Sequence, residues 1–331
     1  MNAEATSPAL RFTPEQIAAA QRTVYAAMPP TPQYAWPLLG ERLGCTLWVK
    51  HENHTPVGAF KIRGGLTYMA ALVERQPQVR HVISATRGNH GQSIGFAARR
   101  HGLAATIVVP HGNSVEKNAA MRALGVQLVE HGDDFQAASE HAGVLAAAQG
   151  LHRVPSFAPE LVCGVATYWV EFFEALQRAG QVPDVVFVPI GLGSGFAGAA
   201  VARAHCGVQT RLIGVVSAHA TAYRDSFRAG HAVDAPVTTR LADGMACRTP
   251  DAAALDLILR AADDVIAVTD DDVAAAMRAL FTDTHNVAEG AGAAALAGAL
   301  QQQERWRGKT VGITVSGGNV DAAMFSGVLS A

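Results

Sequence analysis

The sequence is poor in charge and in cysteine, and these shortages exclude several classes of protein. Only 16% of its 331 residues are charged and the formal net charge is −2, so the chain carries no basic surface of the kind that binds nucleic acid. The four cysteines (Cys45, Cys163, Cys206 and Cys247) lie far apart and form no Cys-x-x-Cys pair. We therefore expect neither a structural zinc site nor a disulfide framework, and this cysteine usage fits the reducing cytoplasm.

Long apolar runs are also missing. No stretch reaches the roughly 18 to 20 apolar residues of a membrane-spanning helix, so we expect no contact with a membrane. The N-terminal segment MNAEATSPALRFTPEQ has no basic start followed by an apolar block, so a signal peptide is not expected either. Hydrophobic residues still make up 49% of the chain, enough for a large core in one domain or two lobes.

Strand-like and helix-like segments alternate along the chain. Apolar runs typical of buried strands cover residues 81–85, 104–110, 126–132, 184–190, 210–216 and 309–316. Helical spacing covers residues 91–102, 114–125, 135–150, 191–207, 271–285 and 291–303. This alternation predicts an α/β fold with parallel sheets and crossover helices. The helical pattern lapses near residues 156–159, which predicts a small domain over 81–158 and a large domain over 1–80 plus 159–331.

Small, hydrogen-bonding residues follow three of these strands. The turns read TRGNHG (86–91), GLGSG (191–195) and SGGN (316–319). Because open α/β sheets bind ligands at the carboxyl ends of their strands, the three turns predict one ligand site.

Each turn has a functional and a purely structural interpretation. GLGSG before a helix suits a phosphate, but it is no Walker sequence and matches a dinucleotide fingerprint only loosely, so a tight turn without a ligand is the alternative. His90 is a candidate base or a structural histidine at a helix start. The Ser316 hydroxyl bonds either its own turn or a ring nitrogen in the cleft.

One lysine, Lys61, lies within VGAFKIRG (57–64), behind an aromatic ring and among small residues. Desolvation lowers the pKa of a lysine and makes it a nucleophile or a Schiff-base former. Most lysines are solvated surface groups, so this stretch alone leaves both interpretations open.

Taken together, the four segments resemble the fold type II pyridoxal-phosphate enzymes, which have the tryptophan synthase β-like fold. The resemblance is to the serine/threonine dehydratase and serine racemase branch. The family pattern runs S-F-K-x-R-G, S-x-G-N-H-G-Q, a glycine tetrad and S/C-G-G-N. This chain offers AFKIRG (59–64), TRGNHGQ (86–92), GLGSG and SGGN in the same order. The resemblance implies two open parallel-sheet lobes, with pyridoxal 5′-phosphate in the cleft between them, and a homodimer.

The resemblance also implies roles for individual residues. Lys61 would carry the cofactor through its aldehyde and later move the α-proton. Asn89 would donate to the 3′-oxygen of the cofactor, and Ser316 would meet the pyridine nitrogen. The other implied cofactor contacts are Phe60, Glu289 near the ring, and the phosphate turn of Gly191, Leu192, Gly193, Ser194 and Gly195. The substrate carboxylate is implied to lie on Thr86, Arg87, Gly88, Asn89 and His90.

The chain departs from the family pattern at several positions. Ala59 replaces the serine before Phe-Lys, a minor change. Arg87 replaces the serine that is the second base of the racemase, and a guanidinium is a poor base, so racemisation is disfavoured. Metal-dependent members have acidic residues where this chain has Ser217 and Tyr223, and hard cations prefer carboxylate oxygens, so we expect no metal there.

The expected function is an ammonia-lyase (dehydratase) that converts an L-threonine-like or L-serine-like β-hydroxy amino acid to a 2-oxo acid and ammonia. The chain ends soon after SGGNVD without a regulatory domain, which favours a role in amino-acid catabolism. A bulkier substrate such as 3-phenylserine or 3-hydroxyaspartate is an alternative, because Arg87 and Gly290 alter the rim of the pocket. An amino-acid racemase and a non-catalytic binding protein of the same fold are further alternatives.

Overall fold

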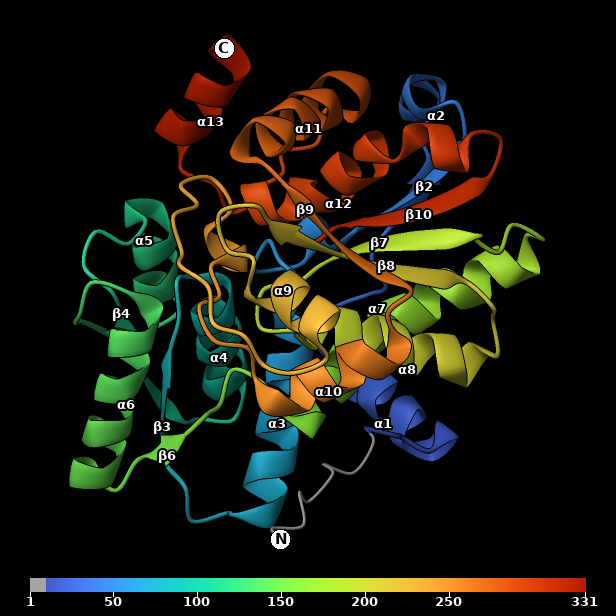
Figure 1. The fold of residues 1–331 in the computed structure, drawn as a ribbon. Helices are drawn as coiled ribbons and strands as arrows, with labels where there is room; N and C mark the ends of the chain where they lie inside the picture. The colour runs from blue at the N-terminus through green and yellow to red at the C-terminus, as the bar shows by residue number, and fades with distance from the viewer. Residues whose placement is uncertain (1–9) are drawn as a thin grey trace, which may run out of the picture.

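The computed structural model describes residues 10–331 and contains two sheets, both visible in Figure 1. The larger sheet has the strand order β1 (Gln33–Ala35), β2 (Thr46–His51), β10 (Thr310–Val315), β7 (Val185–Pro189), β8 (Arg211–Ser217) and β9 (Asp264–Val268). All its neighbouring strands are parallel except β1, which pairs antiparallel with β2. Since β7 and β10 are buried on both faces, their apolar runs need no alternation with polar residues.

The smaller sheet is entirely parallel. Its order is β5 (Gln127–Glu130), β4 (Ala104–Val109), β3 (His81–Ala85) and β6 (His152–Arg153). The chain segments between these strands form α4 (Asn89–Arg100), α5 (Val115–Ala123) and α6 (Phe135–Gln149). This sheet and its helices form the left side of the molecule in Figure 1. The side-chain oxygens of Ser114 and Asp134 accept backbone N–H bonds at the starts of α5 and α6, which fixes where these helices begin.

Helices cover both faces of the larger sheet. The helices outside the smaller sheet's segment are α1 (Pro14–Tyr25), α2 (Pro37–Leu43), α3 (Lys61–Arg75), α7 (Pro159–Arg178), α8 (Ser194–Cys206), α9 (Ala222–Ala229), α10 (Ala252–Ala261), α11 (Asp270–Thr284), α12 (Gly290–Gln301) and α13 (Ala322–Ser330). Of these, α3 packs in one hydrophobic cluster with β3, β4 and α4 of the smaller sheet. Short 3₁₀ segments are η1 (Glu52–His54), η2 (Asp243–Met245) and η3 (Gln303–Trp306). One hydrophobic cluster joins α7, α8 and α10 to one face of the sheet, and a second cluster joins α2, α11 and α12 to the other face.

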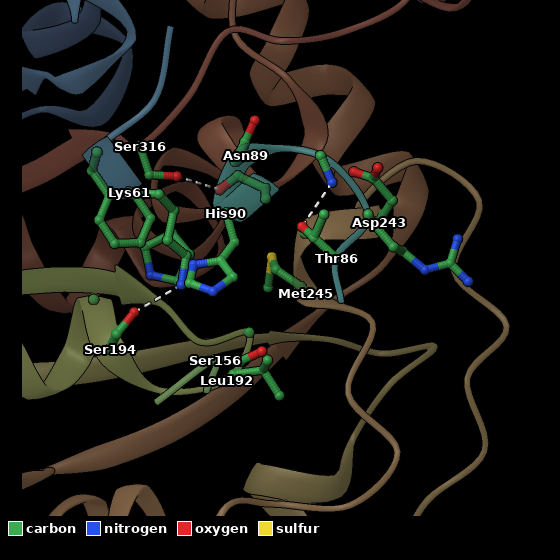
Figure 2. A pocket seen from close by; sticks show the side chains of 18 of the residues that line it. Lys61, Thr86, Asn89, His90, Ser156, Leu192, Ser194, Asp243, Met245 and Ser316 are labelled. Atoms are coloured by element: carbon green, nitrogen blue, oxygen red, sulfur yellow. Dashed lines mark hydrogen bonds between the residues drawn. The ribbon is translucent and has the colours of Figure 1, made fainter. Parts of the chain in front are cut away.

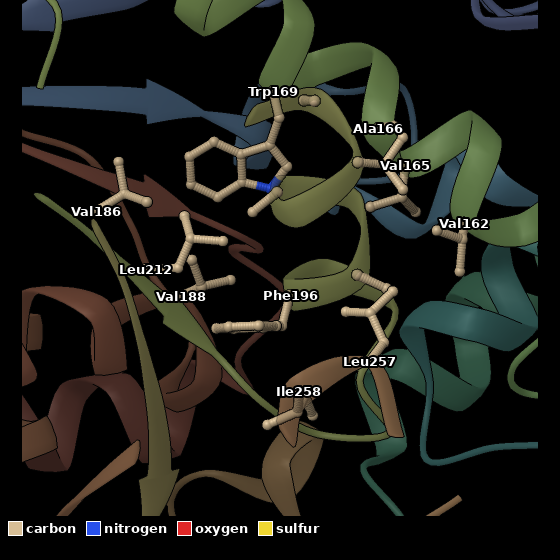
Figure 3. Close-up of a cluster of buried hydrophobic side chains, with 14 of the residues drawn as sticks. Val162, Val165, Ala166, Trp169, Val186, Val188, Phe196, Leu212, Leu257 and Ile258 are labelled. Atoms are coloured by element: carbon tan, nitrogen blue, oxygen red, sulfur yellow. The ribbon is translucent and has the colours of Figure 1, made fainter. Parts of the chain in front are cut away.

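Large aromatic side chains fill the first of these clusters. Figure 3 shows Trp169 of α7 and Phe196 of α8 among Val186 and Val188 of β7 and Leu212 of β8. Trp169 and Phe196 are fully buried, and removing a side chain of this size from water contributes about 1.5–3 kcal/mol. This packing holds the start of α8 against the end of β7.

The predicted parallel sheets and crossover helices are confirmed, and the chain has the two-sheet α/β fold expected from the resemblance. The predicted strands and helices are present, with ends that differ by a few residues. The helix predicted over 191–207, for example, begins at Ser194, because residues 191–193 form the turn. The division into domains at residues 81 and 159 stays a prediction. Within residues 10–331, no helix combines the length and the apolar character needed to span a bilayer.

Candidate active site

One cavity lies at the carboxyl ends of β3, β7 and β10, between the two sheets (Figure 2). Its walls include Phe60, Lys61, the turn 86–90, the turn 191–195, Glu289 and Ser316. Every site residue predicted from the sequence therefore lines this one cavity. What each of them binds stays a prediction.

Lys61 is the first residue of α3, and its amine points into the cavity (Figure 2). Nζ donates a hydrogen bond of 2.8 Å to Oγ of Ser194 and lies 5.0 Å from the centroid of the Phe60 ring. Burial lowers the pKa of Lys61 to about 8. A substantial fraction of this amine is therefore neutral near physiological pH, as a nucleophile or a base requires.

Arg63 anchors the helix that carries Lys61. Its guanidinium is fully buried and donates two hydrogen bonds to Glu52, of 2.8 and 2.9 Å, and two to Glu171, of 2.5 and 3.1 Å. Lys50 completes the cluster with a bond of 2.6 Å to Glu171. Although burial lowers it, the carboxylates of Glu52 and Glu171 hold the pKa of Arg63 above its ordinary value. This cluster explains the arginine two residues after Lys61.

The turn 191–195 leads directly into α8. Gly193 has a φ of 94°, and a Cβ added there would lie 2.6 Å from Cβ of Ala254, so the turn requires glycine. At Gly195 an added Cβ would meet only the Phe60 ring and the carbonyl of Pro189, both at 3.6 Å, and would fill cavity space. No side chain caps α8, so its first N–H groups are free to bind an anion.

The turn 86–90 is the second helix start in the cavity. The N–H of Gly88 donates to Oγ1 of Thr86 at 2.9 Å, and no side chain caps α4. Burial lowers the pKa of His90 to about 3, so its ring is neutral near physiological pH and takes up no proton there. Nε2 of His90 is buried and has no hydrogen-bond partner among the described residues, which leaves it available to a ligand.

Ser316 follows β10, and its hydroxyl donates to the carbonyl of Ala291 at 3.3 Å. The bond drawn at Ser316 in Figure 2 is this one. The oxygen keeps a free acceptor position toward the cavity that Ser316 lines. A contact between Ser316 and a ring nitrogen stays a prediction.

Several residues of the cavity were not predicted from the sequence. Lys117 of α5 and Asp243 of η2 form an ion pair of 2.8 Å, and Ser156, Tyr168 and Met245 line the same walls. Lys117 could have been found, since its helix follows β4 and so starts at a strand end like the other turns. Asp243 lies in an irregular segment with no pattern that points to the site.

Four helices begin at this cavity. Lys61, Asn89 and Ser194 are the first residues of α3, α4 and α8, and Glu289 is the N-cap of α12. The amino end of each helix carries a partial positive charge. The cavity therefore favours a ligand with several anionic groups, such as a phosphate and a carboxylate.

The positions compared with metal-dependent relatives carry no carboxylate. Ser217 accepts a bond from the N–H of His219, and the hydroxyl of Tyr223 accepts one from the N–H of Asp251. Among residues 10–331, no group of three histidine, cysteine, aspartate or glutamate side chains could hold a metal ion. The lack of a metal requirement stays a prediction.

The cavity fits pyridoxal phosphate group by group. Lys61 supplies an amine for the aldehyde, and the start of α8, with the space at Gly195, suits the phosphate. The amide of Asn89 and Nε2 of His90, which has no partner among the described residues, offer hydrogen-bonding atoms for the remaining polar groups.

Comparisons with known proteins agree with this fit. The family described as "Pyridoxal-phosphate dependent enzyme" matches residues 24–317. The chain is 36% identical over 301 residues to the biosynthetic L-threonine dehydratase of Salmonella typhimurium, covering 90% of this chain and 58% of that protein. It is 30% identical over 301 residues to the L-threo-3-hydroxyaspartate ammonia-lyase of Saccharomyces cerevisiae, covering 91% of each. The structure of the processed form of threonine deaminase isoform 2 from Solanum lycopersicum superposes with a TM-score of 0.85 at 27% identity, covering 98% of this chain and 96% of that one.

The chain thus spans a little over half the length of the Salmonella dehydratase, 58%, and nearly the whole of the yeast ammonia-lyase. The family match covers all four segments that carry the sequence resemblance, apart from the last two residues of SGGN. The chain belongs to the family of pyridoxal-phosphate dependent enzymes, and pyridoxal phosphate is its cofactor.

Proposed function

We propose that the protein is an ammonia-lyase that removes water from a β-hydroxy amino acid of the L-threonine or L-serine type. The observation that carries the proposal is the buried amine of Lys61, with a pKa of about 8, in a cavity where four helices begin. The names of the Salmonella and Solanum lycopersicum relatives support the same reaction.

Different residues of the chain hold the cofactor, orient the substrate and move the proton in such a reaction. When bound, pyridoxal phosphate supplies an electron sink that stabilises negative charge at Cα of the amino acid. The N–H groups at the start of α8 hold the phosphate, and those of the turn 86–90 orient the substrate carboxylate. Nζ of Lys61 removes the proton from Cα, because its neutral form is well populated near pH 8.

The overall reaction balances without an oxidant or a metal. The Cα–H and Cβ–O bonds break, the hydroxyl leaves with a proton as water, and hydrolysis of the enamine product returns a water and gives a 2-oxo acid and ammonia. A racemase would need a second base on the opposite face. Arg87 occupies that position in the family pattern, and a guanidinium does not release its proton, which favours elimination.

Two measurements test this proposal. Purified enzyme incubated with L-threonine or L-serine should release the 2-oxo acid and ammonia in equal amounts, and Lys61→Ala should abolish that release. Retained turnover in Lys61→Ala would contradict the role of Lys61. Chiral analysis of the recovered substrate distinguishes the lyase from the racemase alternative. Recovery of substrate with inverted configuration, without release of a 2-oxo acid, would indicate a racemase. The alternative of a non-catalytic binding protein is supported if the absorbance spectrum of the bound cofactor does not change when any amino acid is added.

A second candidate substrate is a bulkier or anionic β-hydroxy amino acid, as in 3-phenylserine or 3-hydroxyaspartate. Arg87 lines the main cavity and also an adjoining one, which contains Asn113, Ser114 and Arg240. Nε of Arg87 is buried and has no hydrogen-bond partner among residues 10–331. The yeast relative is named for 3-hydroxyaspartate, which supports this candidate.

A substrate panel separates the candidates. Equal concentrations of L-threonine, L-serine, 3-phenylserine and 3-hydroxyaspartate are compared by kcat/KM for 2-oxo acid release. Preference for 3-hydroxyaspartate that is lost in Arg87→Met, with L-threonine turnover retained, would assign Arg87 to a second carboxylate. An unchanged preference in Arg87→Met would remove that role.

We further propose that the enzyme is a cytoplasmic homodimer with the domains 81–158 and 1–80 plus 159–331. The family resemblance supports the dimer, and four free cysteines are compatible with a reducing compartment. Light scattering on the purified chain tests the dimer, and a monomer mass would contradict it.

A further inference from the structure

Lys117 is a buried cation that the proposed reaction does not use. It lies in the first turn of α5, beside the smaller sheet, and only 6% of its side chain is exposed. Its Nζ is 2.8 and 3.1 Å from the two carboxylate oxygens of Asp243 and 3.1 Å from Oε2 of Glu289. Asp243 and Glu289 belong to η2 and the N-cap of α12, on the side of the larger sheet. Lys117 thus joins carboxylates across the cleft.

The contacts continue from Glu289 toward Lys61. Oε1 of Glu289 accepts a short hydrogen bond from Nδ2 of Asn89. Oδ1 of Asn89 accepts a bond of 2.9 Å from Nδ2 of Asn319, which also donates to the carbonyl of Val57 at 2.8 Å. Val57 is in the segment that leads into Lys61, so an ion pair at Lys117 continues, from Glu289 onward, as a chain of hydrogen bonds along the cavity to that segment.

This chain fixes which way the amide of Asn89 faces. A carboxylate can only accept, so Glu289 selects the NH₂ group of Asn89, and Asn319 selects its oxygen. An amide NH₂ has two hydrogens, and only one is used by Glu289. The second is left for the cavity that Asn89 lines, where the cofactor binds.

Glu289 contributes to this orientation only while it is ionised, whereas the contribution of Asn319 does not depend on charge. Burial raises the pKa of Glu289, Lys117 lowers it and Asp243 raises it. The other charged groups around this part of the cavity are Lys61 of α3, Arg87 of the turn before α4, Arg240 before η2 and Asp321 before α13. Only Lys117 is within 4 Å of the Glu289 carboxylate as a cation partner among the described residues. Without Lys117, the buried carboxyl of Glu289 would take up a proton and could donate, so Glu289 would no longer favour the NH₂ group of Asn89 and the orientation would be left to Asn319.

We propose that Lys117 is a positioning residue for the cofactor, which holds Glu289 as a carboxylate and thereby turns the N–H of Asn89 toward the cofactor. The inference rests on the cofactor and on no particular substrate. It is therefore tested by binding, and a failure of the proposed lyase reaction would leave it unaffected.

The experiment is a titration of the full-length chain, freed of cofactor, with pyridoxal 5′-phosphate between pH 6 and pH 9. Dissociation constants are compared for the wild type, Lys117→Met, Lys117→Arg, Glu289→Gln and the double variant Lys117→Met/Glu289→Gln. Lys309→Met, on the surface, is the matched control for loss of a lysine. The dissociation constant of each variant is divided by that of the wild type at the same pH, because Lys61 titrates in all of them.

We expect Lys117→Met to weaken binding about tenfold at pH 6, the size of one lost hydrogen bond to a charged group. The ratio should fall toward one as the pH rises, because Glu289 then loses its proton without help. Lys117→Arg should bind like the wild type, and Lys309→Met should not change the constant. In the Glu289→Gln variant, the additional replacement Lys117→Met should weaken cofactor binding no further.

Two results would overturn the proposal. One is a ratio for Lys117→Met that is the same at every pH. The other is that Lys117→Met weakens cofactor binding by the same factor whether residue 289 is Glu or Gln. Either result would indicate that Lys117 only joins the two halves of the molecule. If Lys117→Met does not fold, Lys117→Gln keeps a donor between the carboxylates without the charge and takes its place in the same comparison.

Discussion

Replacing Arg63 should destabilise the protein far more than replacing a surface arginine on the same helix. In Arg63→Met, Glu52 keeps only the hydroxyl of Thr31 at 2.6 Å, whereas Glu171 keeps Lys50 at 2.6 Å. Glu52 would then be a fully buried carboxylate without a cation. Removing one partner of a buried ion pair costs about 3–5 kcal/mol, and at roughly 2 °C per kcal/mol for a large domain the melting temperature should fall by about 6–10 °C.

A double variant separates the lost charge from the lost packing. Arg63→Met/Glu52→Gln should recover part of the stability that Arg63→Met loses, because the uncompensated buried charge is gone.

The assay is thermal and urea unfolding followed by circular dichroism, at one fixed concentration of cofactor for all variants. Arg75→Met is the matched control, because Arg75 also belongs to α3 but its ion pair with Glu160 is exposed, with side chains 57% and 24% accessible. That variant should lose at most about 1 kcal/mol. If Arg63→Met loses as little stability as Arg75→Met, or if Glu52→Gln recovers none of the loss, the argument from buried charge is refuted.

Three further predictions concern the cavity and the core. The rate at which the cofactor-free chain takes up pyridoxal phosphate should rise with pH around a midpoint near 8, the pKa of Lys61, and a flat profile in stopped-flow absorbance would contradict this. Gly193→Ala should weaken cofactor binding measurably, because Gly193 has a φ of +94° and an added Cβ would lie 2.6 Å from Cβ of Ala254. Gly207→Ala is the control: at a φ of +65° and in open space, it should cost about 1 kcal/mol of stability and leave cofactor binding unchanged. Phe196→Ala should lower the free energy of unfolding by about 3–5 kcal/mol in urea titrations, since Phe196 is fully buried; a loss below about 1 kcal/mol would show that the core collapses around it.

The fold was largely predictable because its signals are local. Apolar runs such as 104–110 became β4, and Ser114 caps α5 as its position suggests. The sequence alone assigned no element to residues 10–56, where β1 and β2 form. Whether β2 lies between β1 and β10 depends on pairing with residues more than 250 positions away, which no local pattern encodes.

The site was predictable to the extent that its residues follow strands. Asn89 follows β3 of the smaller sheet, and Ser194 and Ser316 follow β7 and β10 of the larger sheet, and the carboxyl ends of these strands face one cavity. Lys61 lines the same cavity but follows none of the predicted strands. Lys117 was missed although its helix follows β4, and its partners Asp243 and Glu289 come from distant segments that no local pattern joins to it.

The convergence of four helix starts on the cavity has a consequence for how such a site responds to change. Peptide groups do not ionise, so the helix starts keep their partial positive charge from acid to alkaline solution, and any change of affinity with pH comes from the ligand and from titratable side chains. This charge is also retained when a side chain that does not set the backbone conformation of a turn is replaced, as with Arg87 in place of a serine, whereas Gly193 does set that conformation. The backbone supplies the part of recognition that every substrate shares, and the side chains of the turns remain free to determine which substrate is chosen.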